Sequence, residues 1–259
     1  QQVGLVERAG VALHFLAGIR RGGVSHRGLR VQNFIHTHTA CQRASDRDNK
    51  VGHAQQVDKD LAHIIDERND LALRQAASVD LGTAAQQRLP EELVRLCREE
   101  QAQLVLLAGD VFDGSYSRQT AALLARCLED CAVPVLIAPG NHDFVSPASP
   151  WQQELWPENV HVFRGNLSYV DLEELDCRVY GAGYTSMDCP GLLENFRGER
   201  AFAHTVGVFH GDAVSGKSPY CPVTAGQVAA SNLDYLALGH IHKGGSFTAG
   251  NTLCAWPGC

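Results

Sequence analysis

The fold is decided by the stretch Leu104-Val-Leu-Leu-Ala-Gly-Asp110, in which five apolar residues lead directly into a glycine and a carboxylate. A continuous apolar run of this length predicts a strand buried on both faces of a sheet. The stretch Val133–Asp143 repeats the pattern, because a largely apolar run leads into Pro-Gly-Asn-His-Asp. Amphipathic segments at 86–101 and 118–131 precede the two runs. Alternating helices and buried strands predict an α/β fold with its site at the strand ends.

Shorter strands are predicted further along the chain, at 161–163, 178–180, 205–210, 235–238 and 252–256, with helical pieces at 191–196 and 224–230. Two of these strands again end in polar clusters, His210-Gly-Asp212 and Gly239-His-Ile-His242. Four strand ends therefore deliver Asp, Asn and His side chains toward one rim.

The side chains expected at this rim are a carboxylate (Asp110), an amide (Asn141) and three imidazoles (His210, His240 and His242). A mixed oxygen and nitrogen set suits Mn²⁺, Fe²⁺ or Zn²⁺, whereas Ca²⁺ and Mg²⁺ prefer oxygen ligands alone. The set is large enough for two ions, and the two oxygens of Asp110 are able to bridge them. Two ions about 3.5–4 Å apart hold a phosphate oxygen and lower the pKa of a shared water. The rim therefore predicts phosphoester hydrolysis.

Each motif also has a simpler interpretation. Gly109-Asp110 and the segment 140–143 are each typical of a turn, and His210 taken alone is typical of a histidine in the core. The spacing of His240 and His242 is more specific, because it places both imidazoles on one face of a strand. The order of the motifs, each at a strand end, favours the site.

The ordered series GDxxD at 109–113, GNHD at 140–143, His-Gly at 210–211 and GHxH at 239–242 resembles the calcineurin-like metallophosphoesterases. The stretches VLLAGDVFDG, LIAPGNHDF, VFHGD and NLDYLALGHIHKGG are similar to bacterial DNA-repair exonucleases of the SbcD type, over about residues 86–259. The resemblance implies a layered α/β/β/α sandwich that hydrolyses DNA phosphodiester bonds with two divalent ions, Mn²⁺ before Fe²⁺ or Zn²⁺. It also implies an SMC-like ATPase partner of the SbcC type and a homodimer.

Carried over by position, the resemblance makes Asp110 the carboxylate that bridges both ions. Asn141, His210 and His240 complete the ligands of one ion, and His242 belongs to the other.

The resemblance also assigns the proton chemistry. It makes His142 the general acid and Asp143 the carboxylate that keeps this imidazole protonated and oriented. Asp113 becomes an acceptor that supports the loop.

The chain departs from the family at the first motif, because members begin with a strand that ends in Asp-x-His and no Asp-x-His occurs here. The nearest match is Ser78-Val-Asp-Leu-Gly82, which lacks the histidine. One ion keeps a complete ligand set, while the other keeps Asp110 and His242 only, which puts the activity of this chain in doubt. We also expect the domain to be truncated after Trp256-Pro-Gly-Cys259, before a capping region that grips DNA.

The composition changes near residue 85. Residues 1–85 carry a net charge of +2 and contain only Phe15 and Phe34 of the 18 aromatic residues, whereas residues 86–259 carry a net charge of −9. A segment so poor in aromatic residues is badly equipped to build a core. We therefore expect one domain at 86–259. Residues 1–85 are interpreted as an atypical, irregular segment from a non-native reading frame or a disordered extension, with a divergent native extension as the alternative.

No apolar run of membrane-spanning length and no signal peptide pattern occurs, so we expect a cytoplasmic protein without a membrane partner. The nine cysteines form no CxxC pair, which argues against a disulfide framework and against a cysteine zinc site. Two other functions stay open: a phosphoesterase for a small phosphoester, and a non-catalytic relic that binds at most one metal ion.

Overall fold

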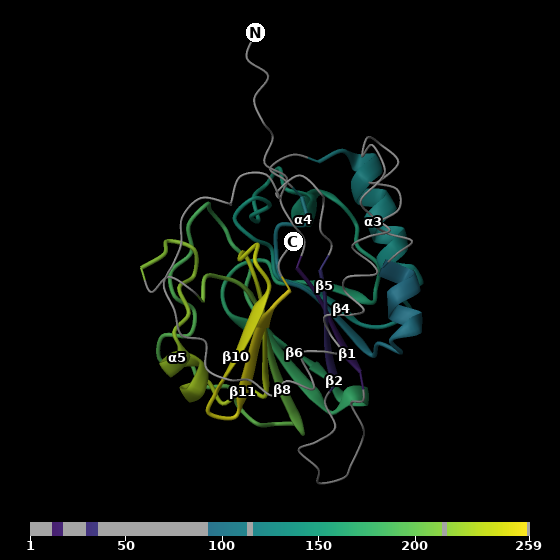
Figure 1. Cartoon of the computed structure of the whole chain (residues 1–259). Helices are drawn as coiled ribbons and strands as arrows, with labels where there is room; N and C mark the ends of the chain where they lie inside the picture. The colour runs from purple at the N-terminus through teal and green to yellow at the C-terminus, as the bar shows by residue number, and fades with distance from the viewer. Residues whose placement is uncertain (1–11, 18–29, 36–92, 113–115, 214–216, 258–259) are drawn as a thin grey trace, which may run out of the picture.

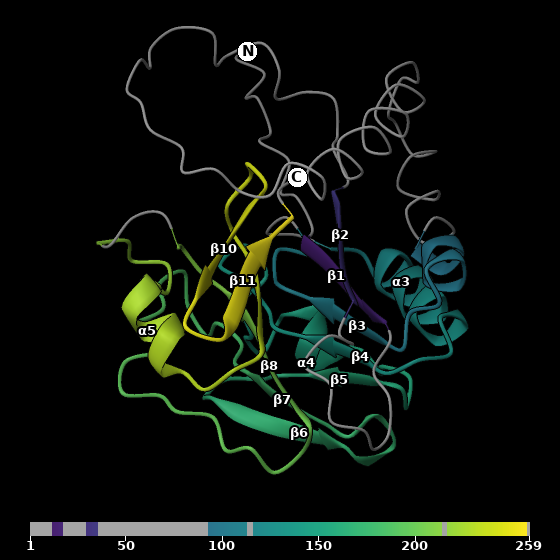
Figure 2. The same ribbon diagram turned by 60° about the horizontal axis from the view of Figure 1, so that its bottom comes forward.

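The computed structural model describes residues 12–17, 30–35, 93–112, 116–213 and 217–257. These residues form two sheets that pack face to face, with helices on the outer sides (Figures 1 and 2). The layered α/β fold predicted from the sequence is therefore confirmed.

The first sheet has the strand order β2-β1-β3-β4-β5. Its parallel part consists of β3 (Leu104–Leu107), β4 (Val135–Ile137) and β5 (Val160–Val162). β1 (Ala12–Ala17) pairs antiparallel with both β3 and β2 (Arg30–Ile35).

Two stretches of the N-terminal segment, ALHFLA and RVQNFI, form strands of this sheet. The first pairs with β3 and the second pairs with the first. The interpretation of residues 1–85 as an atypical segment outside the domain stays a prediction. The rest of 1–85, including the Asp80 region, lies outside the described residues. The origin of this segment in a native or non-native reading frame stays a prediction.

The second sheet has the order β10-β11-β9-β8-β7-β6, and its four inner strands are parallel. The edge strands β6 and β10 pair antiparallel with their neighbours. Both edge strands are largely exposed, so they lack the continuous apolar run by which the inner strands were predicted. The strands are β6 (Ser168–Leu172), β7 (Cys177–Gly181), β8 (His204–His210), β9 (Tyr235–Gly239), β10 (Gly245–Ala249) and β11 (Thr252–Trp256).

Helices cover the outer faces of the two sheets. A helix at 93–99 and α3 (Arg118–Asp130) pack on the first sheet, and α5 (Ala225–Ala230) lies on β10 and β11 of the second. A short α4 (Pro150–Gln153) follows the loop after β4, and a single 3₁₀ turn, η1 (Glu173–Leu175), links β6 to β7. The helix predicted at 191–196 is wrong: the segment forms turns, and Asn195 adopts a left-handed φ of 59°.

Residues of β3 alternate between two cores, as expected for a strand covered on both faces. Val105 and Leu107 pack with Leu128 of α3 between the first sheet and its helices. Leu104 and Leu106 pack between the two sheets.

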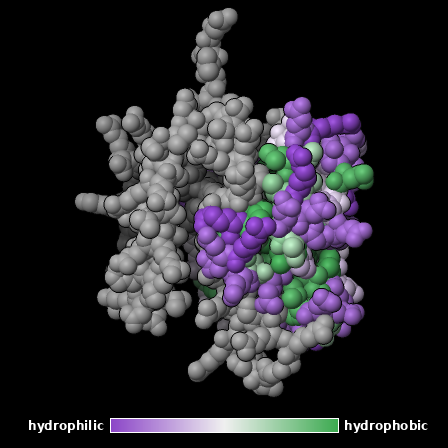
Figure 3. Space-filling model, turned by 90° about the vertical axis from the view of Figure 1, so that its right-hand side faces the viewer, coloured by the Kyte–Doolittle hydropathy of each residue, from purple (hydrophilic) through white to green (hydrophobic). Residues whose placement is uncertain are grey.

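On the face that carries α3, the described residues are mostly hydrophilic, with apolar side chains scattered among them (Figure 3). Within the described ranges, no helix is both long and apolar enough to cross a membrane.

Candidate metal centre

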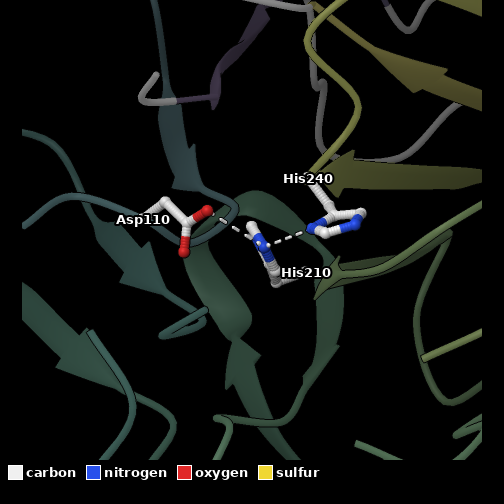
Figure 4. Close-up of side chains that lie close together, drawn as sticks. All are labelled: Asp110, His210 and His240. Atoms are coloured by element: carbon white, nitrogen blue, oxygen red, sulfur yellow. Dashed lines mark hydrogen bonds and ion pairs between the residues drawn. The ribbon is translucent and has the colours of Figure 1, made fainter. Parts of the chain in front are cut away.

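Four strand ends meet at one place in the structure. Asp110 and Asn141 follow β3 and β4 of the first sheet, whereas His210 ends β8 and His240 follows β9 in the second sheet. Figure 4 shows Asp110 and His240 on either side of the His210 ring. The two sheets approach so closely here that a Cβ on Gly239 would lie 1.7 Å from the carbonyl oxygen of Ala108.

The Nε2 atom of His210 is the centre of this group. It lies 2.9 Å from Oδ1 of Asn141, 3.2 Å from Oδ2 of Asp110 and 3.2 Å from Nδ1 of His240. The ring is buried, with 1% of the residue exposed, and its Nδ1 donates to the carbonyl oxygen of Ala108 at 2.9 Å. Because the carbonyl is able only to accept, Nε2 is the nitrogen left for a ligand.

These donor atoms fit a divalent first-row metal ion. Two ligands that lie about 2.1 Å from such an ion, at right angles to each other, are about 3.0 Å apart. The spacings of 2.9–3.2 Å around Nε2 of His210 agree with that value. A neutral His210 ring that donates from Nδ1 has no proton on Nε2, so Nε2 and the oxygens of Asn141 and Asp110 all face one another as acceptors. A group of facing acceptors is suited to a cation.

Ionisation in this group follows burial and neighbouring charge. Burial opposes the charge on Asp110, but the hydrogen bond and the charge of His210 lower the pKa of this carboxyl below its ordinary value. Burial likewise opposes the charge on His210, while Asp110 raises the pKa of this imidazole. For His240, burial and the neighbouring His210 lower the pKa to about 4. The lowered value keeps His240 neutral, as a metal ligand must be.

The backbone bends sharply where the strands enter the site. Gly109 and Asp110 both have a positive φ, 86° and 56°, and His240 has a φ of 83°. A Cβ on Gly109 would lie 2.3 Å from Nδ1 of His210, so glycine is needed there for space as well as for conformation. Left-handed conformations at non-glycine residues cost about 1–3 kcal/mol each and are found most often at functional sites.

Asp143 links the loop that follows β3 to the loop that follows β4. Its Oδ1 accepts hydrogen bonds from the N–H groups of Gly140 (2.7 Å) and Asp110 (3.2 Å), and its Oδ2 accepts from Val111 (2.8 Å) and Phe112 (3.2 Å). Burial and the charge of Asp110 raise the pKa of Asp143 to about 6, and the N–H donors oppose this shift. Both oxygens of Asp143 therefore accept backbone N–H groups. Orientation of the His142 imidazole by Asp143, which the resemblance implies, stays a prediction.

Comparison with known proteins places the chain in a family. The model of the calcineurin-like phosphoesterase family matches residues 80–244. The chain belongs to that family. It is 32% identical over 173 residues to the uncharacterized metallophosphoesterase YhaO of Bacillus subtilis (strain 168), and the match covers 61% of this chain and 41% of YhaO. A crystal structure of TT1561 of Thermus thermophilus matches with 15% identity and a TM-score of 0.44, over 65% of this chain and 82% of TT1561.

Three further site residues were predicted for this calcineurin-like domain: His142, His242 and Asp113. The backbone N–H of His142 donates to Oδ1 of Asp110 at 3.0 Å, while its side chain is exposed. His242 is also exposed and is not one of the three residues, Asp110, His210 and His240, whose ligand atoms lie within 4.8 Å of one another. Asp113 lies outside the described residues. Metal binding by His242 and proton donation by His142 stay predictions.

Two tyrosines contact the candidate ligands and were not found from the sequence. Tyr184 packs edge-on against the His210 ring, with centroids 5.4 Å apart, and its buried hydroxyl has no hydrogen-bond partner among the described residues. Tyr220 packs on the His240 ring at 4.7 Å. The first tyrosine follows the small residues Gly181-Ala-Gly183 at the end of β7, a sequence that marks a strand end, whereas Tyr220 lies in a loop without a motif.

Proposed function

We propose that this chain is the metal-binding part of a DNA phosphodiesterase of the SbcD exonuclease type. The observation that carries the proposal is the convergence of Asp110, Asn141 and His240 on Nε2 of His210. This group supports metal-dependent hydrolysis of a phosphoester, which is the chemistry named for the family. The wording of the motifs around the four residues supports DNA as the substrate.

The residues divide into those that hold metal and one that moves a proton. Asp110, Asn141, His210 and His240 would hold one ion, for which we propose Mn²⁺, and His242 would contribute with Asp110 to a second. Such ions supply Lewis-acid chemistry, because they stabilise charge on a phosphate and lower the pKa of water. His142 is exposed beside Asp110 and would donate a proton to the departing oxygen.

A second candidate function is a centre that binds one ion without catalysis. The missing Asp-x-His motif favours it, because the chain then lacks two of the ligands expected for the second ion. Within the described part of the chain, the structure gathers one ligand group around His210.

Metal stoichiometry and substrate length separate these functions. We would titrate the protein with Mn²⁺ by calorimetry and measure hydrolysis of a small phosphodiester and of DNA oligonucleotides of increasing length, with Asp110→Ala as the inactive control. Two ions and hydrolysis that rises with DNA length support the proposal. Two ions with equal rates on short and long substrates indicate a small-phosphoester enzyme, and one ion without hydrolysis indicates the non-catalytic centre.

We also propose an SMC-like ATPase of the SbcC type as a partner in the cytoplasm, with the nuclease as a homodimer. The net charge of −9 over residues 86–259 supports a partner, because an acidic surface does not attract DNA by itself. Co-elution of the chain with a purified ATPase of this type would test it, and separate elution at micromolar concentrations would contradict it.

A further inference from the structure

Two buried thiols lie beside the metal centre and have no role in the proposed function. Cys189 and Cys221 are 9% and 0% exposed. The backbone N–H of Cys221 donates to the carbonyl oxygen of Cys189 at 2.8 Å, and the Cys189 thiol donates to the carbonyl oxygen of Pro190 at 3.4 Å. Each thiol also shifts the pKa of the other, so the backbone contact brings the two side chains close to each other.

The geometry of the pair is compatible with a disulfide. Cys189 pairs with Tyr220 in a parallel bridge, so Cys221 lies one position along the neighbouring segment. Neighbouring segments are about 4.8 Å apart and one residue adds about 3.3 Å along the chain, which puts the two Cα atoms about 6 Å apart, within the range of about 4.4–6.8 Å found across disulfides. The two sulfurs must approach to about 2.05 Å to form the bond, so oxidation would fix both side chains in a new position and pull on the segments that carry them.

This movement would reach the candidate metal ligands by two routes. Tyr220, which precedes Cys221, packs on the ring of His240 with centroids 4.7 Å apart. The backbone N–H of Asp212, two residues after His210, donates to the carbonyl oxygens of Tyr220 at 3.0 Å and Cys221 at 3.2 Å. The segment that a disulfide would pull thus touches both histidine-bearing loops.

We propose that Cys189 and Cys221 form an oxidation-sensitive pair whose disulfide weakens metal binding at His240. With a peroxide as the oxidant, the Cys189 sulfur attacks one peroxide oxygen, the O–O bond breaks, and a sulfenic acid and hydroxide form. The Cys221 sulfur then attacks the Cys189 sulfur, forms the S–S bond and releases a second hydroxide. The two thiol protons convert the hydroxides to water, so two thiols are oxidised while one peroxide is reduced.

Cys189 is assigned the first step for two reasons. It is the more exposed of the two residues, at 9% against 0%. The neighbouring Cys221 thiol also lowers the pKa of the Cys189 thiol, which favours the reactive thiolate.

Differential alkylation and peptide mapping of the whole chain, before and after hydrogen peroxide, test the thiol chemistry. We expect a linked peptide that contains Cys189 and Cys221, its loss with dithiothreitol, and its absence from Cys189→Ser. The buried thiols of Cys177 and Cys254 serve as internal controls and should stay reduced. Free alkylation of both Cys189 and Cys221 after oxidation, in protein that is denatured only for labelling, would overturn the pair.

Mn²⁺ titration tests the coupling, which rests on the metal centre proposed above. We expect oxidised protein to bind Mn²⁺ at least about tenfold more weakly than reduced protein, with recovery in dithiothreitol and no change in Cys189→Ser. A linked peptide with unchanged Mn²⁺ affinity would overturn the coupling. If reduced protein binds no Mn²⁺, the centre and the coupling both fail, whereas the linked peptide still decides the thiol pair.

Discussion

The carbonyl oxygen of Ala108 orients His210, because it accepts a hydrogen bond from Nδ1 at 2.9 Å and turns Nε2 toward Asp110. This contact links the end of β3 in one sheet to the end of β8 in the other. The candidate metal centre therefore depends on the packing of the two sheets. We expect substitutions of the ligands to weaken metal binding more strongly than they lower the free energy of unfolding.

His210→Ala should weaken Mn²⁺ binding by at least about 100-fold, because the loss of even an outer supporting group costs about 10–100-fold in metal affinity. His204→Ala is the matched control, since His204 begins the same strand that His210 ends. Calorimetric titration of both variants checks the prediction. Equal affinities in the two variants would show that His210 is a core histidine.

Two substitutions of Tyr184 separate the role of its ring from that of its hydroxyl. The buried hydroxyl has no partner in the described part of the chain, so Tyr184→Phe removes an unpaired polar group. This change should leave the free energy of unfolding unchanged or raise it by about 1 kcal/mol. Tyr184→Ala removes the ring that packs on His210 and should lower the free energy of unfolding by about 3–5 kcal/mol. Urea denaturation measures both effects. A large loss in Tyr184→Phe would mean that the hydroxyl has a partner in solution.

Asp143→Asn should weaken the hydrogen bonds that hold the loops after β3 and β4 together. The carboxylate accepts four backbone N–H groups, whereas an amide places an NH₂ group against two of them. We expect a loss of about 1–3 kcal/mol in the free energy of unfolding together with weaker Mn²⁺ binding. Asp188→Asn, at an exposed carboxylate, is the control and should change neither. An Asp143→Asn protein of unchanged stability would instead favour the role implied by the resemblance, which is orientation of His142.

The candidate ligands and their supporting contacts differ in how far the sequence alone was able to predict them. Asp110, Asn141, His210 and His240 each end or follow a buried apolar run. Parallel pairing brings Asp110 close to Asn141 in one sheet and His210 close to His240 in the other, which was predictable. The two pairs meet because the sheets pack face to face, and no single motif marks that packing. The partner of His210 Nδ1 is a backbone carbonyl, which every residue carries and which no motif marks.

Other features were missed for different physical reasons. β6 and β10 are edge strands with one exposed face, so their sequences show no apolar run. β1 and β2 lie in a segment with too few aromatic residues to predict a core, and they pair at one edge of the first sheet. The contacts of Asp143 to the loop after β3 span more than 30 residues of sequence, a distance over which no motif predicts a partner.

The ion pair between Arg178 and Asp171 should make stability depend on pH in the acid range. The Arg178 side chain is 7% exposed, donates to both oxygens of Asp171 at 2.6 and 2.8 Å, and lowers the pKa of that carboxyl below 3.8. A carboxyl with a lowered pKa in the folded state stabilises the fold above its unfolded pKa, and this contribution disappears as pH falls through the folded pKa. The urea midpoint should therefore fall less between pH 5 and pH 3 in Asp171→Asn than in the wild type, with exposed Glu194→Gln as the control.

His142→Ala and Asp110→Ala should differ in which function they lose. His142 is exposed, and its backbone N–H, which alanine keeps, donates to Asp110, so truncation of its imidazole should leave Mn²⁺ binding nearly intact. In a form of the protein that hydrolyses phosphodiesters, the same change should lower the rate by about 10²–10⁴, which is the usual contribution of a positioned general acid. Asp110→Ala should abolish Mn²⁺ binding and, with it, hydrolysis. Calorimetry beside a hydrolysis assay with Mn²⁺ measures the contrast. Equal loss of metal in both variants would assign His142 to the metal ligands and leave the proton donor to another residue.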